Sequence, residues 1–188
     1  MSMLSSAIRH LAGFLAVIGG VLLLALAGIT VLSVTGRVLS AIGLGPIRGD
    51  FELVEIGCAI TVFCFLPWCQ LQRGQVSVDI LADHLPGRGP ALTRVLGDLA
   101  LCLVAGVLLW RIWLGFGEKW PGGSAGLRET FGFGAPPFFA ETTYELLIPA
   151  WIPLSLCLPG AVLLLLACLV TLIESLTGLI QTRKGAAQ

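Results

Sequence analysis

Long apolar runs separated by short polar segments are the dominant pattern along the chain. The runs cover residues 11–32, 53–71, 95–116 and 148–173. A helix of about 20 apolar residues crosses the hydrocarbon core of a bilayer, which is about 30 Å thick. The pattern therefore predicts an all-α integral membrane protein, a single domain over residues 1–188 with four transmembrane helices.

The second run is short and has charged or polar residues at both ends. Glu52 and Glu55 open it, and Arg73, Gln75 and Asp79 follow it. The two acids are i,i+3 neighbours on one helix face. They either stabilise the positive N-terminal end of the helix dipole or pair with a basic surface on a partner. Charges at a membrane edge need water or such a partner.

The third run contains one acid and one base, Asp98 and Arg111. They lie about 20 Å apart along a helix axis and so cannot pair within one straight helix. Two interpretations follow. The side chains extend to opposite membrane interfaces, or they form salt bridges with another chain.

The connections between the runs predict short amphipathic helices on the membrane surface, one within residues 33–50 and one within 72–93. The longest connection, 117–145, is rich in aromatic residues, which act as membrane-edge anchors or as a docking surface for a soluble partner. Pro153 and Pro159 are expected to bend the fourth helix.

Composition narrows the functional class. Hydrophobic residues make up 56% of the chain and charged residues 12%, half the typical share of a soluble domain, about 25%. Eleven basic and eleven acidic residues cancel, with no basic tract for nucleic acid. The six cysteines lie in apolar segments without a C-x-x-C pair, as packing residues do. His10 and His84 lie outside the apolar runs, which argues against haem. We expect no catalytic, cofactor-binding or metal-binding residues.

The first run indicates the topology. It is longer than the apolar core of about 7–15 residues in a cleaved signal peptide, so we expect an uncleaved first helix. Four spans place both termini on one side of the membrane. Slightly more of the eleven Lys and Arg residues fall on that side, which favours cytoplasmic termini.

Several short motifs then follow one another in a recognisable order. They are Thr35-Gly36-Arg37, the acidic segment 51–55, the segment 73–79 that begins Arg-Gly and ends in Asp79, Ile148-Pro149-Ala150-Trp151, and Pro159-Gly160. Together they resemble the small membrane subunit of tripartite ATP-independent periplasmic (TRAP) transporters. Gln75 stands where histidine is frequent in that family, which leaves a hydrogen-bonding role there but puts a protonation role in doubt.

The resemblance implies a function that composition alone does not show. The small subunit of the bacterial inner membrane would be a non-catalytic scaffold for a large membrane subunit, which holds the substrate and sodium sites. A periplasmic binding protein would deliver an organic acid. The alternative is a free-standing four-helix membrane enzyme or redox protein, and co-purification of a larger membrane chain distinguishes the two. Eight residues at the edges of the spans are candidates for partner contacts: Arg37, Glu52, Glu55, Arg73, Gln75, Asp79, Asp98 and Arg111.

Overall fold

The protein is a set of long helices, as the apolar runs predict. The structure is a computed structural model that describes residues 2–74, 89–139 and 141–185. Its elements are α1 (Ser2–Val38), the 3₁₀ helix η1 (Leu39–Ile42), α2 (Asp50–Leu71), α4 (Gly89–Lys119), α5 (Ala125–Thr130) and α6 (Trp151–Gly185). Four of them, α1, α2, α4 and α6, are long and apolar enough to cross a membrane. The described residues contain no strand, only an isolated bridge between Thr142 and Pro149. The predicted all-α membrane fold is confirmed.

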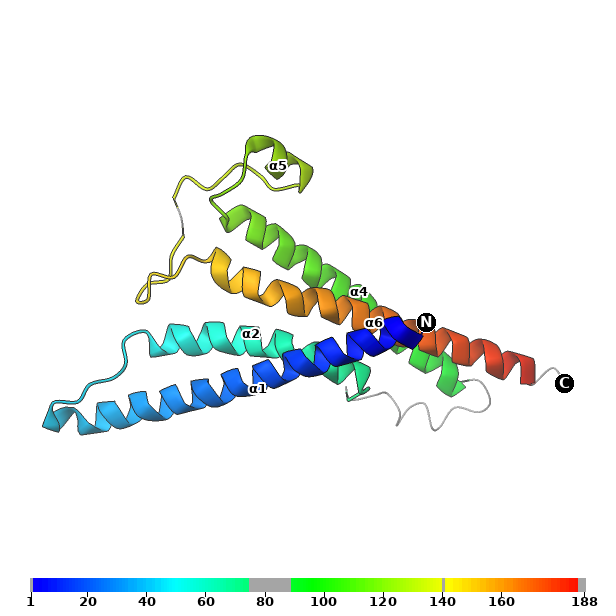
Figure 1. Cartoon of the computed structure of the whole chain (residues 1–188), viewed down its shortest axis with the longest axis horizontal. Helices are drawn as coiled ribbons and strands as arrows, with labels where there is room; N and C mark the ends of the chain where they lie inside the picture. Colours follow the sequence, from blue (N-terminus) through cyan, green and yellow to red (C-terminus); the bar gives the residue numbers. More distant parts are fainter. Residues whose placement is uncertain (1, 75–88, 140, 186–188) are drawn as a thin grey trace.

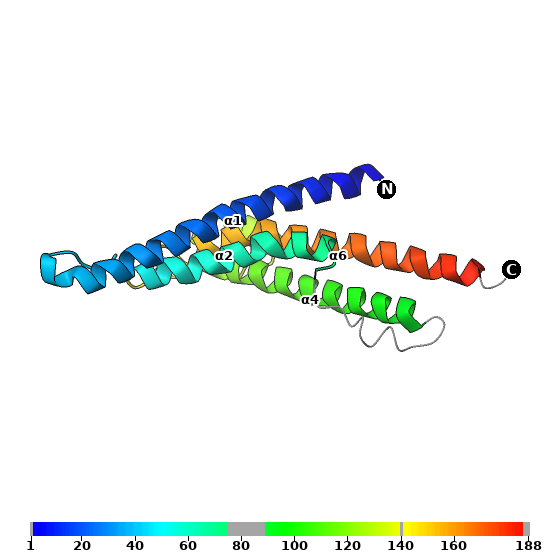
Figure 2. The ribbon, with the colours of Figure 1, turned by 90° about the horizontal axis from the view of Figure 1, so that it is seen from below.

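The four long helices lie side by side in the order α1, α2, α6, α4 (Figures 1 and 2). Helix α2 packs between α1 and α6, and α6 packs between α2 and α4. Both chain termini lie at one end, which we call the termini end, together with the end of α2 and the start of α4. At the opposite end, the loop end, η1 connects α1 to α2 and the segment 120–150 connects α4 to α6 (Figure 1).

Small residues allow these helices to approach closely. A Cβ atom at Gly57 of α2 would lie 2.6 Å from the side chain of Leu26 on α1. One at Gly160 of α6 would overlap the backbone of Phe63 on α2. Ala12 of α1, at 0% exposure, is part of the same interior. Close backbone approach through Gly and Ala is how membrane helices gain packing energy without a hydrophobic driving force.

The first helix is longer than its apolar run, so the short helix predicted within residues 33–50 is reduced to a single 3₁₀ turn. Helix α1 continues to Val38, because residues 33–38 contain no proline and carry side chains compatible with a helix. Only the single 3₁₀ turn η1 follows, ended by Gly43 with φ = 88°. The surface helix predicted within 72–93 falls largely outside the described residues.

The fourth helix begins at Trp151, three residues later than the run predicts. The preceding segment is held extended by the Thr142–Pro149 bridge, in which the Ala150 N–H donates to the Glu141 carbonyl at 2.9 Å. Pro153 therefore lies in the first helical turn, where no intrahelical N–H bond is lost, and the bend expected from it does not follow. Pro159 lies inside the helix.

Candidate functional site

A buried carboxylate lies at the centre of the polar contacts at the termini end. The Asp98 side chain on α4 is 8% exposed, and its Oδ2 accepts from the Ser175 hydroxyl on α6 and from Arg73 Nη1 at 3.3 Å. Arg73 Nη2 donates to Ser175 Oγ at 3.1 Å. Nearby, Gln70 Nε2 donates to Thr171 Oγ1 at 2.9 Å. These five residues, the Asp98 network, tie together α2, α4 and α6.

The backbone at Arg73 directs its side chain back toward the helices. Arg73 has φ = 51°, its N–H donates to the Gln70 carbonyl at 3.1 Å, and the Gly74 N–H donates to the Cys69 carbonyl at 2.9 Å. This pair of bonds is the Schellman motif, which ends many helices and usually has glycine at the left-handed position. A non-glycine residue in that conformation costs about 1–2 kcal/mol. The contacts of the guanidinium group offset this cost.

A second carboxylate joins α1 to α2 at the loop end. Asp50 Oδ2 accepts from Ser33 Oγ and from Arg37 Nη2, each at 2.5 Å. The Arg37 guanidinium also lies over the Phe51 ring, 4.9 Å from its centroid. Asp50 is the first residue of α2, where a negative charge is stabilised by the helix dipole. We call these residues the Asp50 network.

Two glutamates hold the segment before α6 against the start of α2. The carboxylate of Glu52 accepts from the backbone N–H groups of Glu145 and Leu146, at 2.9 and 3.0 Å. In return, the Glu145 carboxylate accepts from the Gly49 N–H at 2.5 Å. This reciprocal arrangement, the Glu52–Glu145 clamp, fixes the 141–150 segment to α2. It also shows that Glu52 has a partner within its own chain.

A buried arginine organises the rest of the loop end. Arg128 in α5 is 3% exposed, and its three guanidinium nitrogens donate to five backbone carbonyls. The acceptors are the carbonyls of Gly134, Trp120, Gly122, Gly117 and Ala135, at 2.9, 2.7, 3.0, 2.8 and 3.4 Å. Because a guanidinium has five N–H donors, every one of them can be satisfied here.

Aromatic rings pack beside this arginine. Phe133 is 8% exposed, and its ring centroid lies 5.1 to 6.3 Å from those of four aromatic residues: Trp113, Phe116, Trp120 and Phe131. Phe116 in turn lies 6.5 Å from Trp151 at the start of α6. The segment 117–135, which we call the Arg128 cap, is therefore a packed unit on the ends of α4 and α6. Phe138, Phe139 and Tyr144 lie outside it and are strongly exposed.

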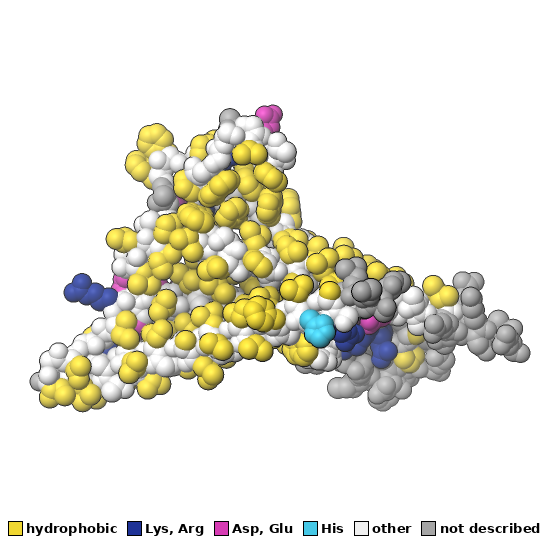
Figure 3. Space-filling view, in the orientation of Figure 1, with side chains coloured by type: hydrophobic (Ala, Val, Ile, Leu, Met, Phe, Trp, Pro, Cys, Tyr) yellow, Lys and Arg dark blue, Asp and Glu magenta, His cyan; other side chains and the backbone are white. Residues whose placement is uncertain are grey.

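The charged side chains of these networks hold helices and loops in place. In the described parts of the chain, no three His, Cys, Asp or Glu side chains gather as the ligands of a metal ion would. All six cysteine thiols are free. Apolar side chains cover the lateral face in Figure 3, and charged ones gather toward its two ends. The apolar lateral face and the two charged ends are the surfaces that this molecule presents to lipid and to other proteins.

Comparison with known families identifies the kind of protein. Residues 26–178 match the family described as tripartite ATP-independent periplasmic transporters, DctQ component. The chain belongs to this family. No curated protein and no solved structure matches it. The chain is thus the small membrane component of a TRAP transporter, a multi-pass protein of the bacterial inner membrane. The alternative of a free-standing enzyme or redox protein is not favoured.

The structure places six of the eight candidate contact residues. Four are engaged within the chain: Arg37, Glu52, Arg73 and Asp98. Glu55 and Arg111 are exposed and have no hydrogen-bond or ion-pair partner in the described part of the chain. Gln75 and Asp79 lie outside the described residues. Asp98 pairs with Arg73 of its own chain, a partner that neither interpretation from the sequence included.

Several residues that complete these networks are not among those predicted from the sequence. Ser33, Asp50, Glu145 and Ser175 supply partners from segments far apart in sequence. Asp50 could have been singled out from the sequence, since it is an acid at the first position of a helix. Arg128 could not, because a lone arginine in a glycine-rich loop is usually a solvated charge.

Proposed function

We propose that this chain is a rigid, non-catalytic scaffold for the large membrane subunit of its transporter. That complex would carry out sodium-coupled uptake of an organic acid delivered by a periplasmic binding protein. The four helices lie side by side as one layer, and the supporting observation is how its ends differ from its outer faces, which we call the flanks. Polar networks tie the helices together at the termini end and at the loop end. The apolar outer faces of α1 and α4 contact no other part of the described chain.

The open flanks are extensive. On α1, large apolar side chains that are 56–76% exposed occur every three or four residues and so lie on one face of the helix. They include Leu11, Phe14, Val17, Val21 and Leu24. On α4, the same holds for Leu96, Leu103, Val107 and Trp110, which are 56–64% exposed. A closed four-helix bundle would bury one such stripe on each helix. A layer instead leaves two flanks for lipid or for another membrane protein.

The proposal assigns the sodium and substrate sites to the large subunit. This assignment is supported by the way the carboxylates of this chain are used. Asp50, Glu52, Asp98, Glu145 and Glu174 each bond to a group of their own chain. An organic acid as the transported solute follows from the resemblance of the motifs.

Recovery of the complex tests the scaffold. An affinity tag on this chain should co-purify a larger membrane protein, and uptake of the solute should require both genes. Tryptophan substitutions along one outer helix, at Phe14 and Val21 of α1 or at Leu103 and Val107 of α4, should release the large subunit from whichever flank it covers. A lipid-covered flank should tolerate them. A chain that purifies alone, or whose deletion leaves uptake intact, would disprove the scaffold role.

Glu52 and Glu55 offer a matched pair of substitutions. Glu52→Gln should lower the thermal stability of the chain, because the Glu145 and Leu146 N–H groups donate to different carboxylate oxygens and the substitution turns one of these acceptors into an NH₂ donor. Glu55→Gln should leave stability unchanged and reduce both recovery of the large subunit and uptake, because the exposed Glu55 is free to pair across the interface. Differential scanning fluorimetry and pull-down measure the two effects. If Glu55→Gln supports full recovery and uptake, Glu55 is not a contact.

We also propose that both termini are cytoplasmic and that the loop end faces the periplasm. The structure places the two termini at the same end, and the first helix runs from Ser2 to Val38 without a break. A reporter that is active only in the periplasm should be silent after residue 188 and active when inserted after Gly134 in the 120–150 connection. Activity after residue 188, or a mature N-terminus just after Ala27, would reverse this orientation.

A further inference from the structure

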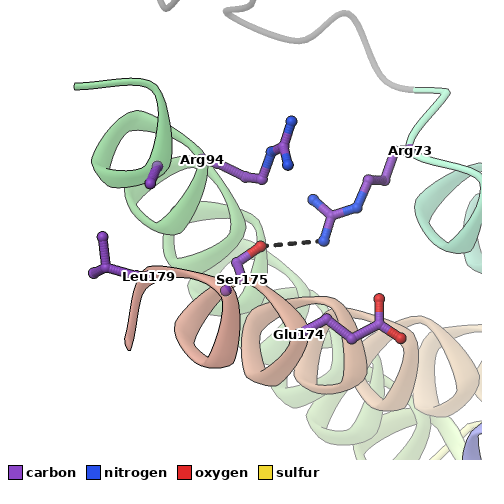
Figure 4. A pocket seen from close by; sticks show the side chains of 7 residues that line it. Arg73, Arg94, Glu174, Ser175 and Leu179 are labelled. Atoms are coloured by element: carbon purple, nitrogen blue, oxygen red, sulfur yellow. Dashed lines mark hydrogen bonds between the residues drawn. The ribbon is translucent and has the colours of Figure 1, made fainter. Parts of the chain in front are cut away.

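Two arginines point into one cavity at the termini end. The cavity has a volume of about 180 Å³ and is lined by Arg73, Ala91, Arg94, Glu174, Ser175, Gly178 and Leu179. Arg73 follows α2 and Arg94 lies in the second turn of α4, and Figure 4 shows both guanidinium groups directed into the same space above Ser175. Such a volume is far more than the roughly 10–15 Å³ that one water requires.

The charges of the described residues around this cavity do not cancel. Asp98 beneath it is engaged by Arg73 and Ser175. Glu174 at its edge pairs with Arg9 of α1 at 3.5 Å. Arg94 has no hydrogen-bond or ion-pair partner in the described part of the chain. Among the described residues, three bases and two acids therefore face this region, and the two guanidinium groups that share the cavity repel each other unless an anion lies between them.

The remaining lining shows what kind of anion fits. Ala91 and Leu179 provide apolar walls beside the two cations, and Ser175 provides a hydroxyl at the base. Arg94 directly precedes the apolar run 95–116 and Glu174 directly follows the run 148–173, so we expect the cavity to lie at the membrane edge, near the lipid headgroups. Guanidinium groups bind phosphate oxygens through paired N–H donors. We propose that this cavity binds a phosphate oxyanion, with the headgroup of an anionic phospholipid as its source.

This site is independent of the proposed scaffold role and can be tested on the full-length chain in detergent. Fluorescent phosphatidylglycerol would be titrated against the wild type, Arg94→Gln, Arg94→Lys and the matched control Arg48→Gln. Arg48 is an exposed arginine at the loop end. Arg94→Gln should weaken binding about fivefold, the factor expected for one basic residue beside an anionic headgroup. Arg94→Lys should retain most of the binding, and Arg48→Gln should match the wild type.

Competition identifies the source of the anion. Displacement by unlabelled phosphatidylglycerol, with little by zwitterionic phosphatidylethanolamine or by inorganic phosphate, supports the lipid headgroup. Equal displacement by inorganic phosphate supports the oxyanion site with free phosphate as its ligand. Protection of Arg94 from phenylglyoxal by phosphatidylglycerol, read by mass spectrometry, tests the same contact without any substitution. Equal binding by Arg94→Gln and Arg48→Gln, with no protection of Arg94, would overturn the proposal.

Discussion

Replacing Arg128 with lysine is expected to unfold the cap at the loop end while leaving the four long helices intact. The guanidinium donates to five carbonyls, and the residue is 3% exposed. A lysine ammonium is a compact group with three donors, so at least two carbonyls would be left without a partner. Each buried polar group left unsatisfied costs about 1–3 kcal/mol. After that loss, the aromatic contacts of Phe133 and the hydrogen bond from Trp113 to the Phe131 carbonyl would have to hold the cap on α4.

Limited proteolysis measures this effect directly. Cleavage within residues 120–139 should become much faster in Arg128→Lys, while the far-ultraviolet circular dichroism of the helices stays near that of the wild type. Arg48→Lys, at an exposed arginine of the same end, is the matched control and should leave cleavage unchanged. Equal cleavage of the two variants would show that the arginine does not hold the cap.

A second substitution disturbs the aromatic packing of the same cap. A Cβ atom at Gly117 would overlap the ring of Phe133, so Gly117→Ala should displace that ring from its position between Trp113 and Trp120. The Gly117 carbonyl is also one of the five acceptors of Arg128. The two variants should therefore give similar cleavage patterns, with a change in tryptophan fluorescence in both.

The helices could be predicted from the sequence, and the polar networks could not. Span number and fold follow from local composition, because twenty apolar residues have few alternatives to a membrane helix. Helix ends were less predictable. Nothing apolar marks Val38 as the end of α1, after which the 3₁₀ turn η1 runs on to the left-handed Gly43. The start of α6 depends on a bridge between Thr142 and Pro149.

The partners of the charged residues could not be predicted without knowing how the helices pack. Asp98 and Arg111 share a helix, and from the sequence alone they offered only an interface or another chain as partners. The actual partner of Asp98 follows a different helix, and the hydroxyl that completes the network comes from a third one. Only the packing of α6 between α2 and α4 brings Arg73, Asp98 and Ser175 together.

Because of that packing, breaking the Arg73–Asp98 pair is expected to lower the stability of the chain strongly. The size of the loss should depend on which of the two residues is replaced. Breaking a buried pair by removing one member costs about 3–5 kcal/mol when the remaining charge stays buried. Asp98 is 8% exposed, whereas Arg73 is 37% exposed and can reach water at the membrane edge. Arg73→Gln should therefore lower the melting temperature of the purified chain much more than Asp98→Asn does.

The double variant tests whether the buried charge is the cause. If it is, Arg73→Gln with Asp98→Asn should melt above Arg73→Gln alone, because neutralising Asp98 removes the unpaired carboxylate. Arg73→Gly adds a backbone test, since glycine relieves the left-handed conformation at φ = 51° and should melt above Arg73→Gln. Differential scanning fluorimetry of the four variants measures these differences. Additive losses in the double variant would contradict the pair, because independent sites add and coupled sites do not.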